Sequence, residues 1–230
     1  MSSLRRDPWL SDVLGVKAFG LEGGGELALQ DLTEANVDFA WVKTSVFEGP
    51  FRTNLETLGF CVIEGSLTFE QSSSPAAVPL SLVRKARPED EEAVALIAGR
   101  SFEHDRFHQD PLIASEVADQ LKSEWARNYF RGSRGDVMFI CERQGVIAGF
   151  LLAIKCEKSA VVIDLIGTSP EFRGQGVASA LLMYLRGWTS GVIRASTQHS
   201  NLSSIRMYVR HGFLPTGSAW TMHFHRKQPS

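Results

Sequence analysis

A glycine-containing loop at the start of a helix carries the strongest chemical signal in the sequence. It follows an apolar run, and its Arg173, Gly176 and Ala178 fit the pattern Arg-x-x-Gly-x-Gly/Ala. The first amide N–H groups of a helix lack partners and carry about half a positive charge. A pyrophosphate reaches those donors only where no bulky side chain intervenes. The loop therefore predicts a pyrophosphate site, with a plain strand-to-helix turn as the alternative.

A dinucleotide-binding fold is a competing interpretation of the same loop, because Gly174-Gln-Gly176 also begins the pattern Gly-x-Gly-x-x-Gly. The third glycine of that pattern is replaced by Ser179. The next strand, at about residues 192–197, ends without the acidic residue that would bind a ribose. These departures argue against a dinucleotide fold.

A second motif, near the C-terminus, places Asn201 and Tyr208 seven residues apart. Seven residues are two helical turns, so both side chains could face a ligand lying along one helix. The spacing leaves two other interpretations open: Asn201 as a helix N-cap, and Tyr208 as a packed aromatic residue. The periodicity also predicts that the apolar residues Leu202, Ile205 and Val209 form the buried face of this helix.

The two motifs and the strand between them together resemble the GNAT superfamily of acetyl-CoA-dependent N-acetyltransferases over residues 82–226. The second motif follows Asn-x-x-Ser-x-x-x-Tyr-x-x-x-Gly-Phe. The resemblance implies an α/β (α+β) fold with a central mixed, mostly antiparallel sheet flanked by helices. It also implies acetyl-CoA as the co-substrate and no metal.

The resemblance assigns roles to individual residues. Tyr208 matches the tyrosine that is commonly the general acid, and Asn201 lies alongside the cofactor. The residues that face pantetheine, from a bulged strand, are Ile166, Gly167 and Thr168. The residues around the pyrophosphate are Arg173, Gly174, Gln175, Gly176, Val177 and Ala178.

A narrower resemblance, to the TDP-fucosamine acetyltransferases, extends upstream. It rests on Leu-Gly-Phe-Cys-Val-Ile-Glu-Gly at residues 58–65, Phe102, the pair Arg106-Phe107, Trp125, Asn128, Arg131-Gly132 and Ala-Ser-Thr-Gln at residues 195–198. It implies that the acceptor is the amine of a dTDP-linked 4-amino-4,6-dideoxy sugar. The candidate substrate-binding residues are Arg106, Phe107, Asn128 and Arg131. The loop, with Pro170-Glu-Phe, is instead that of ordinary GNAT enzymes.

The chemistry requires an amine to lose a proton and a thiolate to gain one. A tyrosine, with a pKa of about 10, can protonate a thiolate whose pKa is about 8.5. Two residues are candidates for the general base. Asp164 is an isolated acid in an apolar strand, and His199 follows the next strand. A solvent-facing role for either residue, and a chain of water molecules in place of a dedicated base, both stay open.

The elements that position these groups divide the chain in two. Residues 71–81 are small, polar and proline-punctuated, which predicts a linker between a small α/β domain at 1–70 and a catalytic domain at 82–230. In the second part we expect a strand, two helices, three strands, a helix, a strand, a helix and a final strand. Residues 55–63 echo residues 208–216, so the first domain is either a truncated GNAT-like unit or a chance similarity.

Composition excludes several classes of protein. A net charge of −2 argues against nucleic acid as a partner. The three cysteines, Cys61, Cys141 and Cys156, are too scattered for a zinc site or a disulfide framework, which favours a reducing cytoplasm. No apolar run approaches the roughly 18 residues that would span a membrane.

We therefore expect a cytoplasmic enzyme whose partner is a small-molecule nucleotide amino sugar. GNAT relatives are often dimers, which leaves a homodimer open. The alternatives are acetylation of a protein, peptide or small-molecule amine, and an acetyl-CoA-binding module without catalysis.

Overall fold

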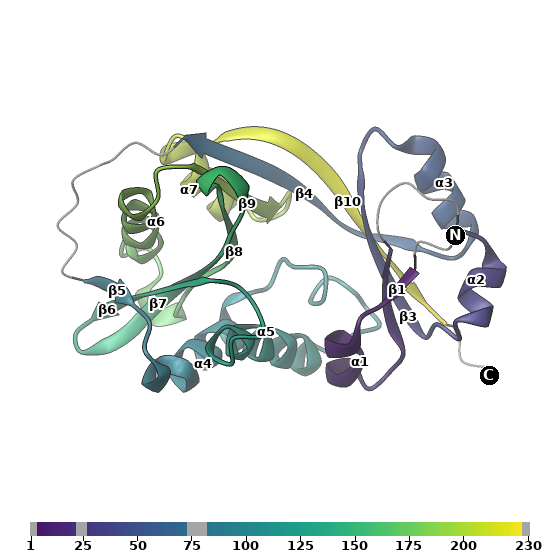
Figure 1. Ribbon diagram of the computed structural model, residues 1–230, viewed down its shortest axis with the longest axis horizontal. Helices are drawn as coiled ribbons and strands as arrows, with labels where there is room; N and C mark the ends of the chain where they lie inside the picture. The colour runs from purple at the N-terminus through teal and green to yellow at the C-terminus, as the bar shows by residue number, and fades with distance from the viewer. Residues whose placement is uncertain (1–3, 22–26, 73–81, 227–230) are drawn as a thin grey trace.

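The computed structural model describes residues 4–21, 27–72 and 82–226. One ten-stranded sheet runs through two lobes in the order β1-β2-β3-β10-β4-β9-β8-β7-β6-β5 (Figure 1). Only β2–β3 and β8–β9 pair in parallel. The mixed, mostly antiparallel sheet expected from the sequence is therefore confirmed.

The elements of the first lobe are β1 (Leu4–Arg6), α1 (Pro8–Leu14), β2 (Ala18–Leu21), α2 (Leu29–Glu34), β3 (Phe39–Ser45), α3 (Gly49–Thr57) and β4 (Cys61–Ser72). Those of the second lobe are β5 (Val83–Lys85), α4 (Glu91–Ser101), α5 (Ser115–Phe130), β6 (Val137–Arg143), β7 (Val146–Lys155), β8 (Val161–Thr168), α6 (Val177–Trp188), β9 (Val192–Gln198), α7 (Leu202–Arg210) and β10 (Leu214–His225). Short 3₁₀ turns occupy Pro88–Asp90, Glu157–Ser159 and Pro170–Phe172. Every helix in the described residues is too short or too polar to cross a membrane.

Two long strands join the lobes. Strand β10 pairs with β3 in the first lobe and with β4 along most of its length. Strand β4 in turn pairs with β9 through Ser66–Ser72, so it lies inside the sheet of the second lobe. Of the linker predicted at 71–81, Gln71 and Ser72 belong to β4, and residues 73–81 lie outside the described residues. The division of the chain into domains at residues 1–70 and 82–230 stays a prediction.

Helices cover both faces of the sheet in the second lobe. Helices α6 and α7 pack on one face with Phe69 and Ile193, and α4 and α5 pack on the other with Ile140 and Phe150. A separate cluster around Leu10, Phe39, Phe107 and Leu121 joins α1 to α5 between the lobes (Figure 1). The rings of Trp9 and Trp125 meet edge to face there, with centroids 5.5 Å apart. The lobes therefore share a continuous apolar contact.

Removing β4 tests whether the second lobe folds by itself. A chain shortened to begin at Leu82 should lose cooperative unfolding, because β9 and β10 both lose their pairing with β4 and the buried Phe69 ring leaves its stack on Tyr208. Loss of one buried phenylalanine costs about 3–5 kcal/mol, against a total stability of about 5–15 kcal/mol. Circular dichroism during heating is the measurement. A chain that begins at Gly59 and keeps β4 is the control. Equal melting temperatures for the two chains would contradict this role of β4.

Candidate active site

Strands β8 and β9 separate after a short parallel pairing. They pair only at Val161–Ile163 with Ile193–Ala195. On the other side of β8, Leu152 pairs with Leu165 and Ala153 with Ile163, so Asp164 is the extra residue of a β-bulge. Beyond the bulge, β8 has no strand partner on its β9 side among the described residues. The backbone groups on that side of residues 164–168 are therefore available to an extended ligand.

The residues expected to face pantetheine lie on this unpaired segment. Gly167 sits under the Phe150 ring, where an added Cβ would lie 2.7 Å from a ring carbon. Ile166 packs towards α6, and the Thr168 carbonyl accepts a hydrogen bond from the Ser101 hydroxyl at 3.2 Å. The structure thus places all three on a segment with a free edge. Their contact with a cofactor stays a prediction.

The loop before α6 has the geometry that an anion site needs. Gly174 and Gly176 have φ angles of 75° and 80°, and an added Cβ at either would meet nothing within 4 Å. Gly176 is the N-cap of α6, with no side-chain cap. No hydrogen bond among the described residues uses the amide N–H groups of Val177, Ala178 or Ser179. Three donors therefore point out of the helix into open space.

Two arginines flank this loop. Arg173 is exposed, and its Nη1 lies 3.4 Å from Oε1 of Glu103. Arg143, at the end of β6, donates from Nη2 to the Gln175 carbonyl at 3.4 Å. The pattern that picked out Arg173 gave no sign of Arg143, because only the fold brings the β6–β7 hairpin beside the loop. Both cations lie close to the expected position of the pyrophosphate.

Asn201 is the N-cap of helix α7. The Asn201 Oδ1 atom accepts hydrogen bonds from the Ser204 amide at 3.0 Å and the Ser203 hydroxyl at 2.8 Å. No hydrogen bond of its Nδ2 group occurs among the described residues. The capping interpretation is therefore correct, and the amide nitrogen still has donors for a cofactor.

Tyr208 is the buried residue of α7. It is 2% exposed, and its ring stacks on Phe69 and meets Phe213 edge to face, at centroid distances of 5.5 and 5.2 Å. Burial raises its pKa well above the ordinary tyrosine value. The predicted apolar face of α7 was wrong in part, since Leu202 and Val209 are 57% and 55% exposed. The helix instead turns Tyr208 into the core.

Asp164 is held by four hydrogen bonds. Its Oδ2 atom accepts from Trp125 Nε1 and the Tyr129 hydroxyl, both at 2.8 Å, and from Arg134 Nε at 2.7 Å. Its Oδ1 atom accepts from Arg134 Nη2 at 2.7 Å. Burial alone would raise the pKa of Asp164, but Arg134 and the other donors outweigh it and the pKa is lowered. These contacts favour a structural role at the bulge over a role as general base.

His199 and Glu64 lie on opposite faces of the sheet. The His199 ring covers Gly65, where an added Cβ would lie 2.4 Å from its Nδ1 atom, and its Nε2 atom lies 3.2 Å from the Ser218 hydroxyl. Successive residues of a strand point to opposite faces, so Glu64 faces the other way. His199 is therefore on the face covered by α6 and α7. Its role as a base stays a prediction.

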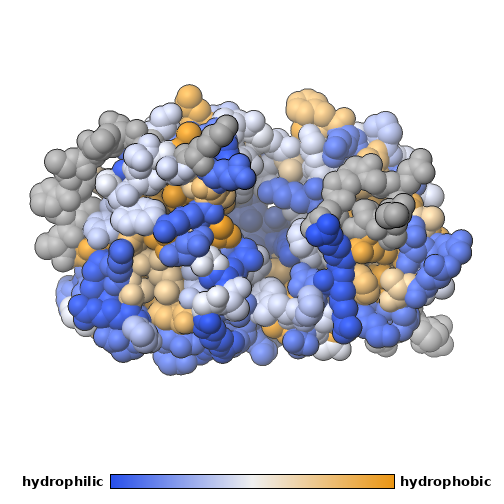
Figure 2. Space-filling view, in the orientation of Figure 1, coloured by the Kyte–Doolittle hydropathy of each residue, from blue (hydrophilic) through white to orange (hydrophobic). Residues whose placement is uncertain are grey.

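A hollow lies between the two lobes (Figure 2). On the face of the sheet that carries Glu64, the residues Lys43, Thr221 and Glu64 are paired neighbours on β3, β10 and β4, the strands that join the lobes. Arg106, from the α4–α5 segment (residues 102–114), lies near Glu64 and Lys43: Arg106 and Glu64 affect each other's pKa, and both affect the pKa of Lys43. We call this site, made by these four residues, the central hollow. Figure 2 shows hydrophilic residues in its depth.

Arg106 is held by aromatic rings. Its guanidinium carbon lies 4.2 Å from the Trp41 ring centroid and 4.5 Å from that of Phe107. Its Nη1 atom is buried and has no hydrogen-bond partner. Burial lowers its pKa to about 10, although Glu64 and Asp105 act in the opposite direction. Phe107 itself is fully buried between the lobes, so it supports Arg106 in place.

Four polar atoms on this face of the sheet or directly over it are buried without a hydrogen-bond partner among the described residues: Glu64 Oε2, Ser66 Oγ, Arg106 Nη1 and His223 Nε2. The other oxygen of Glu64 accepts only a 3.3 Å bond from Thr221. Burial and the charge of Asp105 raise the pKa of Glu64, and burial lowers that of Lys43. Buried polar groups are normally paired, so this concentration indicates a place for a polar ligand.

Neither Glu64 nor Lys43 was predicted from the sequence. Glu64 lies in the stretch at residues 58–65 that supported the narrower resemblance, but nothing local distinguishes it from a surface acid. The predicted substrate residues Asn128 and Arg131 are not brought to Arg106. Arg131 pairs with Glu124 at 2.9 Å, and the Asn128 carbonyl accepts from the turn that follows α5. Only Arg106 and Phe107 of that set lie at the central hollow.

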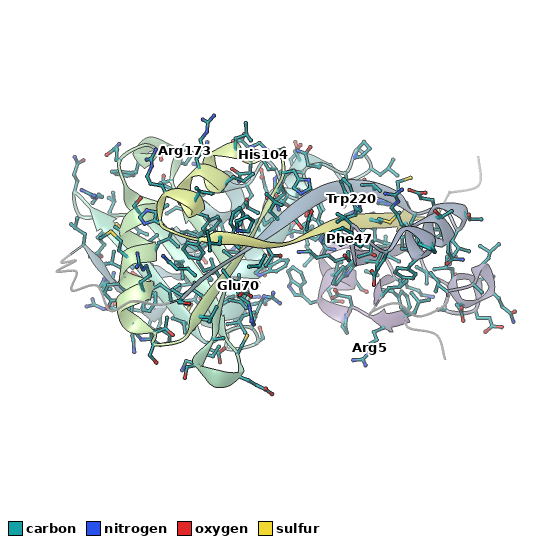
Figure 3. All side chains as sticks on the ribbon, turned by 90° about the horizontal axis from the view of Figure 1, so that it is seen from above. Arg5, Phe47, Glu70, His104, Arg173 and Trp220 are labelled. Carbon is teal, nitrogen blue, oxygen red and sulfur yellow. The ribbon has the colours of Figure 1, made fainter. Side chains whose placement is uncertain are left out.

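The α4–α5 segment is tied to the cofactor side and to β10. Besides the Glu103–Arg173 pair, His104 Nδ1 lies 3.2 Å from the Ser200 hydroxyl. Figure 3 shows Arg173 and His104 along the same side of the molecule. At the other end of the segment, Asp110 accepts hydrogen bonds from two histidines of β10. The segment therefore bridges the two halves of the site.

Asp110, His223 and His225 have side chains that could bind a metal, since their ligand atoms lie within 4.8 Å of one another. Asp110 Oδ2 lies 2.6 Å from His223 Nδ1 and 2.7 Å from His225 Nε2. Two ligands of one tetrahedral zinc ion lie about 3.3 Å apart. Hydrogen bonds therefore account for these contacts better than a shared ion. The expected absence of a metal stays a prediction.

Comparisons with known proteins agree with this geometry. The profile of the Acetyltransferase (GNAT) family matches residues 98–213, just over half of the chain. The spore coat polysaccharide biosynthesis protein SpsD of Bacillus subtilis (strain 168) is 31% identical over 140 residues, which are 59% of this chain. The match spans only 48% of that relative's length.

Three solved structures share the fold. A conserved protein of unknown function from Staphylococcus epidermidis has a TM-score of 0.63 at 13% identity, covering 92% of this chain and 85% of its own. A protein from Novosphingobium aromaticivorans described as a GNAT acetyltransferase gives 0.61 at 19% identity, with 99% and 90% covered. A tandem GNAT protein from the clavulanic acid biosynthesis pathway gives 0.58 at 12% identity, with 94% and 77% covered. With the matching profile, the free edge of β8 and the uncapped start of α6, the chain belongs to the GNAT family of acetyl-CoA-dependent N-acetyltransferases.

Proposed function

We propose that this N-acetyltransferase moves the acetyl group of acetyl-CoA to the amine of a dTDP-linked amino-dideoxy sugar. The observation that carries the proposal is the set of buried, unpartnered polar atoms at the central hollow. Arg106 offers a donor, and Glu64 and His223 offer acceptors. Such a site suits a ligand that has hydroxyl groups, an amine and an anionic group together.

The spacing of the charges suits a long acceptor. Strand β3, which carries Lys43, is three strand positions from β9, where the β8–β9 separation begins. Neighbouring strands lie about 4.8 Å apart, so the span is about 14 Å. An acceptor that places a phosphate near Lys43 and Arg106 can extend its amine towards the thioester. A polyamine has no anionic group to use these cations.

The relative in Bacillus subtilis supports a sugar acceptor, since it is a spore coat polysaccharide biosynthesis protein. The alternative is a protein, peptide or small-molecule amine, and a fold match alone does not separate these. The unpaired Arg106 favours the sugar nucleotide, because a guanidinium fork fits phosphate oxygens. A cytoplasmic location and a homodimer remain predictions.

Acetyl transfer then needs few groups. In this proposal Ile166, Gly167 and Thr168 bind pantetheine through the free edge of β8. The loop from Arg173 to Ala178 holds the pyrophosphate, with Asn201 alongside. The amine attacks the thioester carbon, the C–S bond breaks, and a proton passes to the CoA sulfur. Holding both substrates in one site supplies much of the rate by proximity.

Tyr208 is the proposed donor of that proton, and Tyr208→Phe should lower kcat by about 10²–10⁴-fold. The KM for acetyl-CoA should change little, since the ring and its packing on Phe69 are kept. Because burial raises the Tyr208 pKa, we expect no alkaline loss of activity from this residue at ordinary assay pH. Steady-state kinetics across pH is the measurement. A kcat within about threefold of wild type, well below that catalytic range, would exclude Tyr208 as the acid.

Glu64 is the proposed acceptor of the amine proton, directly or through water, because one of its oxygens has no partner. Glu64→Gln should lower kcat by about 10²-fold. Burial raises the Glu64 pKa, so the carboxylate, and activity with it, is lost as pH falls through that raised value. This acidic limb of the pH profile should vanish in the variant. The control is Glu70→Gln on the same strand, where Glu70 instead pairs with Arg194 (Figure 3). An unchanged acidic limb would exclude Glu64.

The acceptor is tested by thiol release against a panel of amines. We expect turnover with a dTDP-4-amino-4,6-dideoxyhexose and little with lysine peptides or polyamines. Arg106→Met should raise the acceptor KM by about 10- to 100-fold, the value of a charge-assisted hydrogen bond, and leave the acetyl-CoA KM unchanged. Arg127→Met, which removes an arginine paired with Glu92 on the outside of α5, is the control. A preference for peptides at equal concentration would contradict the sugar acceptor.

A further inference from the structure

Arg106 has no ion pair although three carboxylates surround it. Glu64, Asp105 and Asp7 all lie close enough to raise its pKa. No hydrogen bond or ion pair of Arg106 occurs among the described residues, and its Nη1 atom is buried without a partner. A buried guanidinium beside carboxylates is normally paired with one of them. Glu64 holds a 3.3 Å hydrogen bond from Thr221 and makes no ion pair with Arg106 among the described residues. The other two carboxylates, Asp7 and Asp105, have several partners each.

Asp7 is engaged on the first lobe. Its Oδ1 atom accepts the Leu10 amide at 3.0 Å as the N-cap of α1, and its Oδ2 atom accepts a 3.4 Å bond from Trp41 Nε1. The Trp41 ring that carries Arg106 is thus fixed by the same carboxylate. Both oxygens of Asp7 therefore have partners other than Arg106.

Asp105 is the nearest competitor in the chain, since it precedes Arg106. Its Oδ1 atom lies 3.2 Å from Lys122 Nζ and accepts the Phe107 amide at 3.1 Å. Its Oδ2 atom lies 2.5 Å from His108 Nδ1. The His108 Nε2 atom in turn lies 3.0 Å from Asp119. Both oxygens of Asp105 are thus engaged by partners on α5 and in the α4–α5 segment.

Lys122 holds Asp105 from a buried position, where a charged group loses its hydration. It is 5% exposed, and its ammonium lies 5.1–5.4 Å from the ring centroids of Phe102, Phe107 and Trp125. Replacing a buried ion pair by apolar residues of similar size is often neutral or stabilising. Packing alone therefore does not explain a lysine among three aromatic rings, whereas a need to hold Asp105 in a fixed position does.

We propose that Lys122, assisted by His108, is a positioning residue that holds Asp105 away from Arg106, so that the buried guanidinium stays unpaired for an anionic group of the acceptor. The proposal rests on the proposed function, because it supposes an anionic acceptor. An arginine already paired with a carboxylate would have to break that pair before it bound a phosphate. Lys122 removes that competition without touching the acceptor itself.

The test is a double-mutant cycle on binding of dTDP, titrated calorimetrically into enzyme saturated with CoA. In Lys122→Met, Asp105 is released towards Arg106, and dTDP affinity should fall about tenfold. Asp105→Asn in the same chain should restore affinity to within about threefold of wild type, because a neutral amide does not compete for Arg106. A merely structural lysine gives no such rescue. The acetyl-CoA KM should not change in any variant.

Further variants separate this effect from loss of stability. Arg84→Met breaks another ion pair, with Asp90 at 2.7 Å beside α4, and should leave dTDP affinity unchanged. Lys122→Arg keeps a cation and should bind dTDP like wild type. If circular dichroism shows that Lys122→Met is unfolded, the dTDP affinity of the Asp105→Asn variant alone tests the proposal. It should bind dTDP at least as tightly as wild type, and a tenfold loss would overturn the proposal.

Failure of this inference can be told from failure of the proposed function. If wild-type enzyme does not bind dTDP, or Arg106→Met binds it equally well, then the anionic acceptor itself is wrong. If Arg106→Met abolishes binding while Lys122→Met binds like wild type, or is not rescued by Asp105→Asn, then Lys122 does not position Asp105. A weakened Arg84→Met would show that the tenfold loss reflects general destabilisation.

Discussion

Strands β8 and β9 pair for three residues and then separate, and the rest of the molecule is arranged around that separation. In the middle of a sheet, unpaired backbone groups are costly unless another partner satisfies them. The bulge at Asp164 starts the separation, and the four hydrogen bonds to its carboxylate fix it. Helix α6 begins at the open end, where its own first amides are also free. Both sets of free groups suit one extended, phosphorylated cofactor.

The first lobe contributes to the proposed acceptor site, which the β8–β9 region alone does not provide. A cofactor site alone does not choose an acceptor, and the acceptor site that we propose is built from β3, β10 and β4, together with the α4–α5 segment. The polar groups there are set in a mainly apolar contact between lobes, around Phe39 and Phe107. Buried charges without direct partners destabilise a fold. Such groups are expected here if a bound ligand supplies their missing hydrogen bonds.

Features that depend on residues close together in the sequence could be predicted, and features that depend on residues far apart could not. The glycine loop, the Asn201 cap and most strands were predictable, because each depends on residues within a few positions. Glu64 and Lys43 were not, because their meeting depends on strand register set by β10, more than a hundred residues away. The role of Asp164 was equally hidden, since its partners come from α5 and the turn after it. The exposed side of α7 was misjudged because periodicity shows that a helix is amphipathic but not which apolar residues the sheet will cover.

The insertion of β4 between β9 and β10 also has a consequence for synthesis. The chain emerges from the ribosome from its N-terminus, yet β4 pairs with β9 and β10, which begin more than a hundred residues after β4 ends. Residues 61–72 must therefore wait, with both edges unpaired, until β9 and β10 have been made. Such non-local pairing slows folding, and unpaired strands invite association with other chains. The site can form only after β9 and β10 have been synthesised, and a product truncated before them would carry an exposed β4.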